Sequence, residues 1–388
     1  MPLPTVRVNR KAADRLRSGH LWVFASDVAD RGGAQSGDAV RVVDARGHAL
    51  GAAHFSSRSQ ICLRLLSTQV EPIDEAFFHA RIGDAYSYRQ RAVADSDAYR
   101  LVHAEGDLLP GLLADRYGDY VVLQLLDQGM DRARDLIVQS LAELLHPKGI
   151  LARNDVPARA KEGLPQGVET LFGEIPENVR IRMDGLTWRA DPQRGQKTGI
   201  FLDQRENYLA VRKYARGSAL DCFTGTGGFA LHLASVSSSV EAVDASAAAL
   251  EAARTNAAEN GLSNIEFRQA DVLDYLPGLV NARRRFDIVI VDPPAFAKSR
   301  SALEGAARGY KEINLRALQL LGKGGILISC SCSHHMSEAN LLELIAAASL
   351  DAGKRLRVVE RRTQAQDHPI LLTVPETHYL KCLILEVL

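Results

Sequence analysis

The sequence predicts an α/β protein in which a C-terminal, mainly parallel, doubly wound sheet follows a small β-barrel and an α+β connecting domain. From about residue 186 onward, apolar runs such as "FDIVIVD" alternate with helical stretches such as "ASAAALEAARTNAAENGL", the pattern of parallel strands joined by helices. The first 70 residues contain short strands broken by glycines. Because 388 residues exceed one ordinary domain, we predict domains at residues 1–72, 73–185 and 186–388.

Composition narrows the class of protein. The chain is 46% hydrophobic and 24% charged, and its 47 Lys and Arg balance its 47 Asp and Glu, so a polyanion has to be bound through local patches. Its five cysteines show no CxxC spacing, which argues against a zinc site or a disulfide framework and favours the reducing cytoplasm. No apolar leader and no uncharged run of 18 residues is found, so neither secretion nor membrane spanning is expected.

The first domain is predicted from two stretches. "KAADRLRSGHLWVFASDV" is typical of an amphipathic helix that leads into a strand at Trp22–Phe24. In "DAVRVVDARGHALGAAHFS" the strand alternation is broken around Gly37, Gly47 and Gly51, as small barrels require. Residues 1–66 hold ten Lys or Arg and five Asp, a local charge of +5 that fits either a polyanion site or a solvated basic face.

The stretch "RLRSGHLWVF", followed by a glycine-punctuated barrel, resembles a PUA domain, a small RNA-binding module. The resemblance implies RNA contact through Arg15, Arg17 and His20. Trp22 and Phe24 are expected to pack in the core of the barrel.

The connecting domain is predicted to open with a helix over "EAFFHARIGDAYSYRQRAV" and to contain a hairpin at "RYGDYVV". A second strand pair is expected around Asp184–Gly185 in "IRMDGLTWRAD". Nothing in this domain indicates catalysis.

A ligand site is expected at the carboxyl ends of the parallel strands, where doubly wound folds bind their ligands. "DCFTGTGGFALHLA" places a glycine turn after a strand that ends near Asp221–Phe223, which lets a ligand approach the backbone. Asp244 follows the next strand and is suited to accept hydrogen bonds from two ribose hydroxyls; Asp271 could accept from an adenine amino group. Either aspartate could instead be a helix N-cap.

A glycine turn, an acidic second strand end, "AD" after the third strand and "DPP" after the fourth together resemble the class I S-adenosylmethionine-dependent methyltransferases. The dinucleotide spacing GxGxxG is absent from the first turn, which disfavours NAD. The resemblance implies S-adenosylmethionine as cofactor and the following contacts: Asp221, Phe223, Thr224, Gly225, Gly227, Asp244, Ala245, Asp271, Val272, Asp292 and Pro293.

The target site is expected around "VDPPAFAKS", where two prolines fix a rigid turn. Asp292 and the proline carbonyls could meet the edge of a flipped base, Phe296 could stack on it or pack in the protein, and Lys298 is a candidate RNA contact. Methyltransferases of exocyclic amines also carry a DPP-aromatic motif, so the target atom stays open at this point. In "GGILISCSCS" the strand is predicted to end near Cys330, which leaves Cys332 just beyond it. Cys332 is therefore a candidate nucleophile, with an inert buried thiol as the alternative, and Cys330 is expected to be buried.

The whole chain resembles the bacterial 23S rRNA cytosine-C5 methyltransferases of the RlmI type. The matching stretches include "YRLVHAEGDLLPGLLADRYG", "GQKTGIFLDQREN", "RGYKEINLRALQLL", "SCSHHMS" and "DHPILLTVPETHYLK". The resemblance implies that Cys332 adds to C6 of the base, and that Phe201, Gln204 and Arg205 line the cofactor pocket. Many wider cytosine-C5 RNA methyltransferases carry a second cysteine after the motif proline, where this chain has "DPPAF"; release of product would then fall to Asp292 or a water.

The expected partners are 23S rRNA or a large-subunit assembly intermediate, with a homodimer as an open alternative. Two rival functions remain at this point. One is an amine methyltransferase acting on adenine or guanine in RNA, for which Cys332 would be dispensable. The other is a non-catalytic RNA-binding factor that keeps the cofactor fold as a scaffold.

Overall fold

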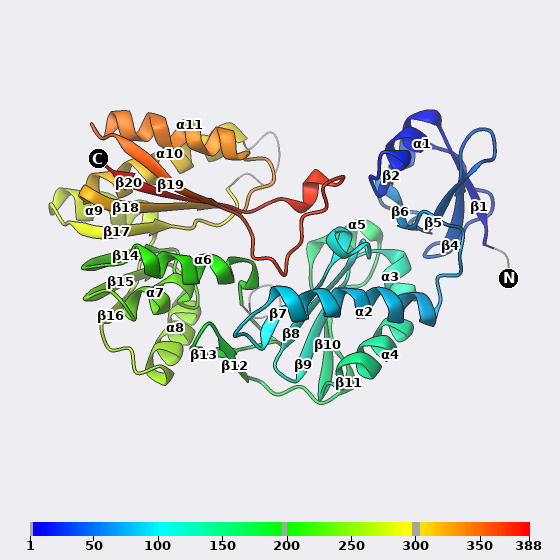
Figure 1. Cartoon of the computed structure of the whole chain (residues 1–388), viewed down its shortest axis with the longest axis horizontal. Helices are drawn as coiled ribbons and strands as arrows, with labels where there is room; N and C mark the ends of the chain where they lie inside the picture. The colour runs from blue at the N-terminus through cyan, green and yellow to red at the C-terminus, as the bar shows by residue number, and fades with distance from the viewer. Residues whose placement is uncertain (1–2, 196–199, 297–302) are drawn as a thin grey trace. The chain divides into compact units, whose positions relative to one another are not determined.

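The computed structural model describes residues 3–195, 200–296 and 303–388. Two compact units divide the chain (Figure 1). The first unit comprises Met1–Met183, Ala190–Leu202 and Gln366–Thr377, and the second comprises Asp184–Arg189, Asp203–Ala365 and His378–Leu388. In the described ranges, no helix combines the length and the apolar character that a membrane span needs.

The N-terminal part of the first unit is a six-stranded sheet of order β2-β6-β5-β4-β1-β3. This sheet has a hydrophobic core separate from those of the other sheets, and the half-buried Trp22 packs against that core. At Gly51, which has φ +139°, a Cβ atom would lie 2.0 Å from the Ser67 carbonyl oxygen, so this position of β5 requires glycine. The predicted helix and strand near Trp22 are confirmed, and the elements are β1 (Thr5–Val8), α1 (Arg10–Arg17), β2 (Trp22–Phe24), β3 (Val28–Asp30), β4 (Ala39–Val43), β5 (Ala49–Phe55) and β6 (Ile61–Ser67).

The next part of the first unit is a five-stranded sheet of order β11-β10-β9-β8-β7 with a separate core. The predicted hairpin is confirmed, because Tyr117 of β8 faces Tyr120 of β9 in an antiparallel pair. The elements are α2 (Glu75–Ala92), β7 (Ala98–His103), β8 (Leu112–Tyr117), β9 (Tyr120–Leu125), α3 (Gln128–Arg132), α4 (Arg134–Leu145), β10 (Gly149–Arg153), α5 (Pro157–Glu162), β11 (Val168–Gly173) and β12 (Val179–Met183). The domain boundaries at residues 72 and 185 stay predictions.

The second unit is built on a seven-stranded sheet of order β16-β15-β14-β17-β18-β20-β19. Strands β14 to β18 are parallel, and β20 runs antiparallel to β18 and β19, so the mainly parallel, doubly wound sheet is confirmed. The elements are β13 (Leu186–Ala190), α6 (Arg205–Ala210), β14 (Ser218–Cys222), α7 (Gly228–Ala234), β15 (Ser239–Asp244), α8 (Ala247–Glu259), β16 (Ile265–Gln269), α9 (Val272–Asn281), β17 (Phe286–Val291), α10 (Leu303–Leu320), β18 (Leu321–Ser331), α11 (Glu338–Asp351), β19 (Leu356–Arg362) and β20 (Lys381–Val387).

Helices cover both faces of this sheet: α6, α7 and α8 lie on one face, and α9, α10 and α11 on the other (Figure 1). The central strand β17 is buried at five of its six positions, with only Asp287 exposed near its start, as expected for a strand covered on both faces. The parallel strands give the sheet two distinct ends. We call the edge after β14, β15, β17 and β18 the carboxyl edge, and the edge where these strands begin the amino edge.

Candidate active site

The turn after β14 has strained backbone at the carboxyl edge. Phe223, which is not a glycine, has φ +65°, and Gly225 and Gly227 have φ +56° and +96°. A Cβ atom at Gly227 would lie 2.2 Å from Leu231 Cδ1. A left-handed non-glycine residue costs about 1–3 kcal/mol, and such residues cluster at ligand sites. The predicted glycine turn therefore has a left-handed backbone at one non-glycine and two glycine positions.

Two aspartates hold this turn. Asp221, fully buried in β14, accepts a hydrogen bond from Thr224 Oγ1 at 2.6 Å. Burial raises the pKa of Asp221 to about 7, and the charges of Asp292 and Asp244 act in the same direction. The Asp244 carboxylate accepts from Gly225 N at 2.9 Å through Oδ2, and from the backbone N–H two residues on through Oδ1.

The two aspartates whose role the sequence left open differ in the structure. Ser246, not Asp244, is the N-cap of α8, so the N-cap interpretation of Asp244 is wrong. Asp271 is the N-cap of α9, with Oδ1 accepting from Leu273 N at 2.8 Å. Its neighbour Val272 is buried in the core, and Ala245 beside Asp244 is exposed.

Gln204 connects the segment before α6 to the DPP turn. Its Nε2 donates to Asp292 Oδ2 at 2.9 Å, and its Oε1 accepts from Asn207 Nδ2 at 2.7 Å. Arg362 Nε in turn donates to Asn207 Oδ1 at 2.9 Å. The buried Gln204 amide is thus fixed in orientation, and it brings two predicted site residues, itself and Asp292, into contact. Pro293, the next residue of the turn, is buried.

The other predicted residues are placed as follows. Arg205 is 3% exposed, and its guanidinium lies 3.8 Å from Asp184 and 3.5 Å from Glu206, so it is an ion-paired buried residue. Phe201 belongs to the first unit, as do Arg15, Arg17 and His20. Lys298 lies outside the described residues. The partners of the three basic residues are carboxylates of the same unit: Arg15 with Asp27 at 3.3 Å, Arg17 with Asp44 at 2.6 Å and His20 with Glu376 at 3.4 Å.

The two thiols of "SCSC" are separated by the end of β18. The strand runs to Ser331, slightly further than predicted, and Cys332 is the next residue. Cys332 is partly exposed, whereas the other four cysteines are buried. Cys330 is fully buried and faces Cys382 of β20, and burial raises its pKa well above the ordinary thiol value. The predicted burial of Cys330 is confirmed, and Cys332 lies past the strand end as expected.

Comparison with known proteins identifies the family. The PUA-like domain model matches residues 6–68, and a methyltransferase domain model matches residues 215–371. The chain is 41% identical over 382 residues to ribosomal RNA large subunit methyltransferase I of Shewanella denitrificans, covering 96% of each chain, and 39% identical over 390 residues to that of Tolumonas auensis, covering 98% of each. The chain belongs to the ribosomal RNA large subunit methyltransferase I family. S-adenosylmethionine is its cofactor.

Solved structures with low sequence identity share the whole fold. A methyltransferase complexed with SAH superposes with a TM-score of 0.85 at 21% identity, and a SAM-dependent methyltransferase from Streptococcus mutans with a TM-score of 0.84 at 21% identity. Each covers 100% of both chains. The family member described here therefore has this fold from its PUA-like barrel to its last strand.

Two residues near Cys332 were missed by the sequence analysis of this methyltransferase. The Tyr310 hydroxyl of α10 lies 2.9 Å from Ser331 Oγ, and the ring of Phe296 packs edge-on against Tyr310 with centroids 5.1 Å apart. Lys381, the first residue of β20, is 4% exposed. Its one sequence signal is a lysine at the head of the apolar run "KCLILEV". The contacts of Tyr310 with Ser331 and with Phe296 do not follow from spacing along the chain, since each joins residues from separate segments.

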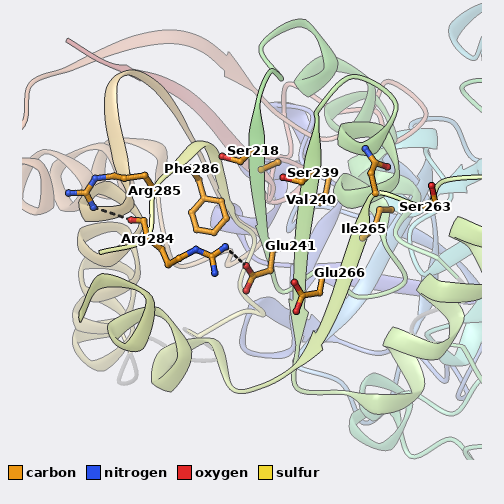
Figure 2. Close-up of a pocket in the computed structure, with 12 residues that line it drawn as sticks. Ser218, Ser239, Val240, Glu241, Ser263, Ile265, Glu266, Arg284, Arg285 and Phe286 are labelled. Atoms are coloured by element: carbon orange, nitrogen blue, oxygen red, sulfur yellow. Dashed lines mark hydrogen bonds and ion pairs between the residues drawn. The ribbon is translucent and has the colours of Figure 1, made fainter. Parts of the chain in front are cut away.

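A cavity of about 280 Å³ lies at the opposite, amino edge of the sheet. Ser218, Ser239, Ile265 and Phe286, which begin four of the parallel strands, line it together with charged residues (Figure 2). The Arg284 guanidinium points to Glu241 across the cavity, 3.2 Å from one carboxylate oxygen. None of the predicted site residues of this methyltransferase lines the cavity, so it is separate from the site at the carboxyl edge.

Proposed function

We propose that this methyltransferase transfers a methyl group to C5 of a cytosine in 23S rRNA, with Cys332 as the nucleophile. The observation that carries the proposal is the position of Cys332, the one partly exposed thiol of five, directly after β18 at the carboxyl edge. The choice of RNA is supported by relatives that are named as methyltransferases of large-subunit ribosomal RNA. Cytosine C5 is a poor nucleophile, so a thiol placed there has a chemical purpose that amine methylation lacks.

The residues of the carboxyl edge fit S-adenosylmethionine. The glycine turn allows close approach to the backbone, and each Asp244 oxygen retains a lone pair for a ribose hydroxyl after accepting its backbone hydrogen bond. Bound S-adenosylmethionine supplies the methyl group as an electrophile. We assign its contacts to Asp221, Phe223, Thr224, Gly225, Gly227, Asp244, Ala245, Asp271, Val272, Asp292 and Pro293, with Phe201, Gln204 and Arg205 on the preceding segment.

The chemistry of the base follows from two side chains. The Cys332 thiolate donates an electron pair to C6, and the resulting enamine makes C5 nucleophilic. After C5 is methylated, Asp292 or a water takes the C5 proton. The electrons of that C–H bond restore the C5–C6 double bond, the Sγ–C6 bond breaks, and the thiolate is regenerated. Each turnover thus leaves the enzyme unchanged.

We assign RNA binding to the PUA-like domain, with Arg15, Arg17 and His20 as contacts, and base contact to Phe296 and Lys298 beside the DPP turn. The assignment of the domain is supported by the family model over residues 6–68 and by the local charge of +5 over residues 1–66. A base that is to be methylated at C5 has to leave its stack, and an aromatic ring beside the turn suits a flipped base.

The test is covalent trapping on RNA that contains 5-fluorocytosine at the target. Fluorine at C5 cannot leave as a proton, so the Cys332 adduct cannot collapse to product. We expect a denaturing gel to show an enzyme–RNA crosslink that requires S-adenosylmethionine and disappears in Cys332→Ala.

Cys330→Ala is the matched control, because it removes a thiol two residues away that is fully buried. We expect it to keep the crosslink. A peptide map with the RNA on Cys330 would reverse the assignment, and full turnover by Cys332→Ala would instead support methylation of an exocyclic amine.

A further inference from the structure

A buried lysine lies alongside Cys332. Lys381 of β20 faces Ser331 in the antiparallel register with β18, and its Nζ donates to the Ser333 carbonyl at 2.7 Å and to the Tyr379 carbonyl at 2.8 Å. The Nζ hydrogen bond thus fixes the side chain to the residue after Cys332, while the backbone of Lys381 pairs with the residue before it. Lys381 is 4% exposed.

This ammonium group has carbonyl partners but no carboxylate. No ion pair of Lys381 is found within 4.0 Å among residues 3–195, 200–296 and 303–388. Burying an ammonium group without an opposite charge costs several kcal/mol, on the order of the penalty for any unpaired buried ion. Burial lowers the pKa of Lys381 to about 8, and a negative charge on Cys332 acts against this by raising it.

The other titratable groups near Cys332 come from three further segments. Tyr310 of α10 carries a hydroxyl whose pKa is raised by burial and also by the charges of Cys332 and Asp292, so it stays neutral and can donate. Asp292, in the turn after β17, adds negative charge. The rings of His334 and Tyr379 lie tilted against each other with centroids 5.6 Å apart, and His334 is exposed. Lys381 is the buried cation of this group.

We propose that Lys381 is a positioning residue whose ammonium group is the counter-charge that holds Cys332 as a thiolate before the base arrives. When the amine is neutral, the thiol proton passes to Nζ, which converts a neutral pair into an ion pair without a change in net charge. Attack on C6 then consumes the thiolate charge, and breaking the Sγ–C6 bond restores it. The inference rests on the proposed function only for the role of Cys332 in methylation.

The test measures the thiol itself, without RNA or S-adenosylmethionine. The rate of iodoacetamide alkylation is followed against pH for the wild type, Lys381→Met and Lys381→Arg, with Cys332→Ala as the blank. The other four cysteines are buried, so the signal reports Cys332. A thiol beside a lysine ionises at about pH 7 or below, against about 8.5 for an ordinary thiol. At pH 7 we expect alkylation of Lys381→Met to be roughly tenfold slower, and that of Lys381→Arg to stay near the wild type.

An unchanged midpoint in Lys381→Met would overturn the inference. Thermal melting shows whether this variant is folded; if it is not, the wild-type profile decides, because a midpoint at or above about 8.5 also excludes a held thiolate. The proposed function fails separately, through full turnover by Cys332→Ala. If Lys381→Met shifts the midpoint and Cys332→Ala still turns over fully, the ion pair between Lys381 and Cys332 would be supported, but it would have no role in methylation.

Discussion

The two edges of the seven-stranded sheet differ in whether their buried charged groups have ion-pair partners. At the amino edge the buried Glu241 is surrounded by cations, with Arg284 at 3.2 Å and Arg268 at 3.5 Å, and it also accepts from the Tyr275 hydroxyl. At the carboxyl edge Asp221 is fully buried, yet in the described part of the chain it makes no ion pair within 4.0 Å. Lys381, at the same edge, likewise makes no ion pair within 4.0 Å in the described part of the chain.

The difference shows where this fold tolerates an unfavourable charge. A buried charge is normally paired, and the amino edge follows that rule beside a cavity. The carboxyl edge has groups whose pKa values are strongly perturbed, including Asp221 at about 7 and Lys381 at about 8, and such groups cluster at functional sites. The carboxyl edge, where we propose that the chemistry takes place, thus differs from the cavity edge in holding buried charges without ion-pair partners in the described part of the chain.

The largest effect is expected from Asp221→Asn. The pKa of Asp221 rises from 3.8 to about 7 on folding, so the native state binds this proton more tightly than the unfolded chain does. The stability that this provides is complete below pH 3.8 and is lost as the pH rises to about 7. Asn cannot ionise but can still accept from Thr224. We expect the variant to exceed the wild type in stability by on the order of 4 kcal/mol above pH 7.

Urea unfolding of the cofactor-free proteins at several pH values between 4 and 8 measures this difference. The difference in unfolding free energy between Asp221→Asn and the wild type should grow as the pH rises and disappear in acid. Asp274→Asn on the exposed surface of α9 is the control, and it should show no such difference. Equal stability of Asp221→Asn and the wild type at pH 8 would mean that the carboxyl edge bears no unfavourable charge at this position.

A second prediction compares one acid from each edge by their effect on cofactor binding. Asp244→Ala removes the proposed ribose acceptor and leaves hydroxyls unpaired, at a cost of roughly 1–3 kcal/mol, or about tenfold to a hundredfold in affinity for S-adenosylmethionine. Calorimetry measures the affinity. Glu241→Gln at the amino edge should leave it unchanged, and equal affinity of Asp244→Ala and the wild type would place the cofactor elsewhere.

The features of the carboxyl edge that lie within one motif could be predicted from the sequence. The glycine turn, the position of Asp244 and the place of Cys332 beyond its strand each depend on a few adjacent residues. Asp271 could not be decided in this way, because an N-cap and a ligand contact use the same carboxylate at the same kind of position, and the structure shows the cap.

Contacts between distant segments could not be predicted. The hydrogen bond from Gln204 to Asp292 joins residues 88 apart in the sequence, and that from Lys381 to Ser333 joins residues 48 apart. The second contact depends on the register between β18 and β20, and a shift by one residue would turn Lys381 to the other face of the sheet. Hydrophobic patterning predicts β18, but it does not give the register of its pairing with β20.

The smallest effect is expected at the amino edge, from Arg284→Ala. The Arg284 side chain is 51% exposed, and its partner Glu241 keeps Arg268 and the Tyr275 hydroxyl after the change. Because a half-exposed ion pair contributes little, we expect a loss of at most about 1 kcal/mol in unfolding free energy. Affinity for S-adenosylmethionine and the methylation rate should stay at the wild-type level. A methylation rate reduced tenfold or more in a folded Arg284→Ala protein would show that the cavity edge takes part in the reaction, and the contrast between the two edges would no longer hold.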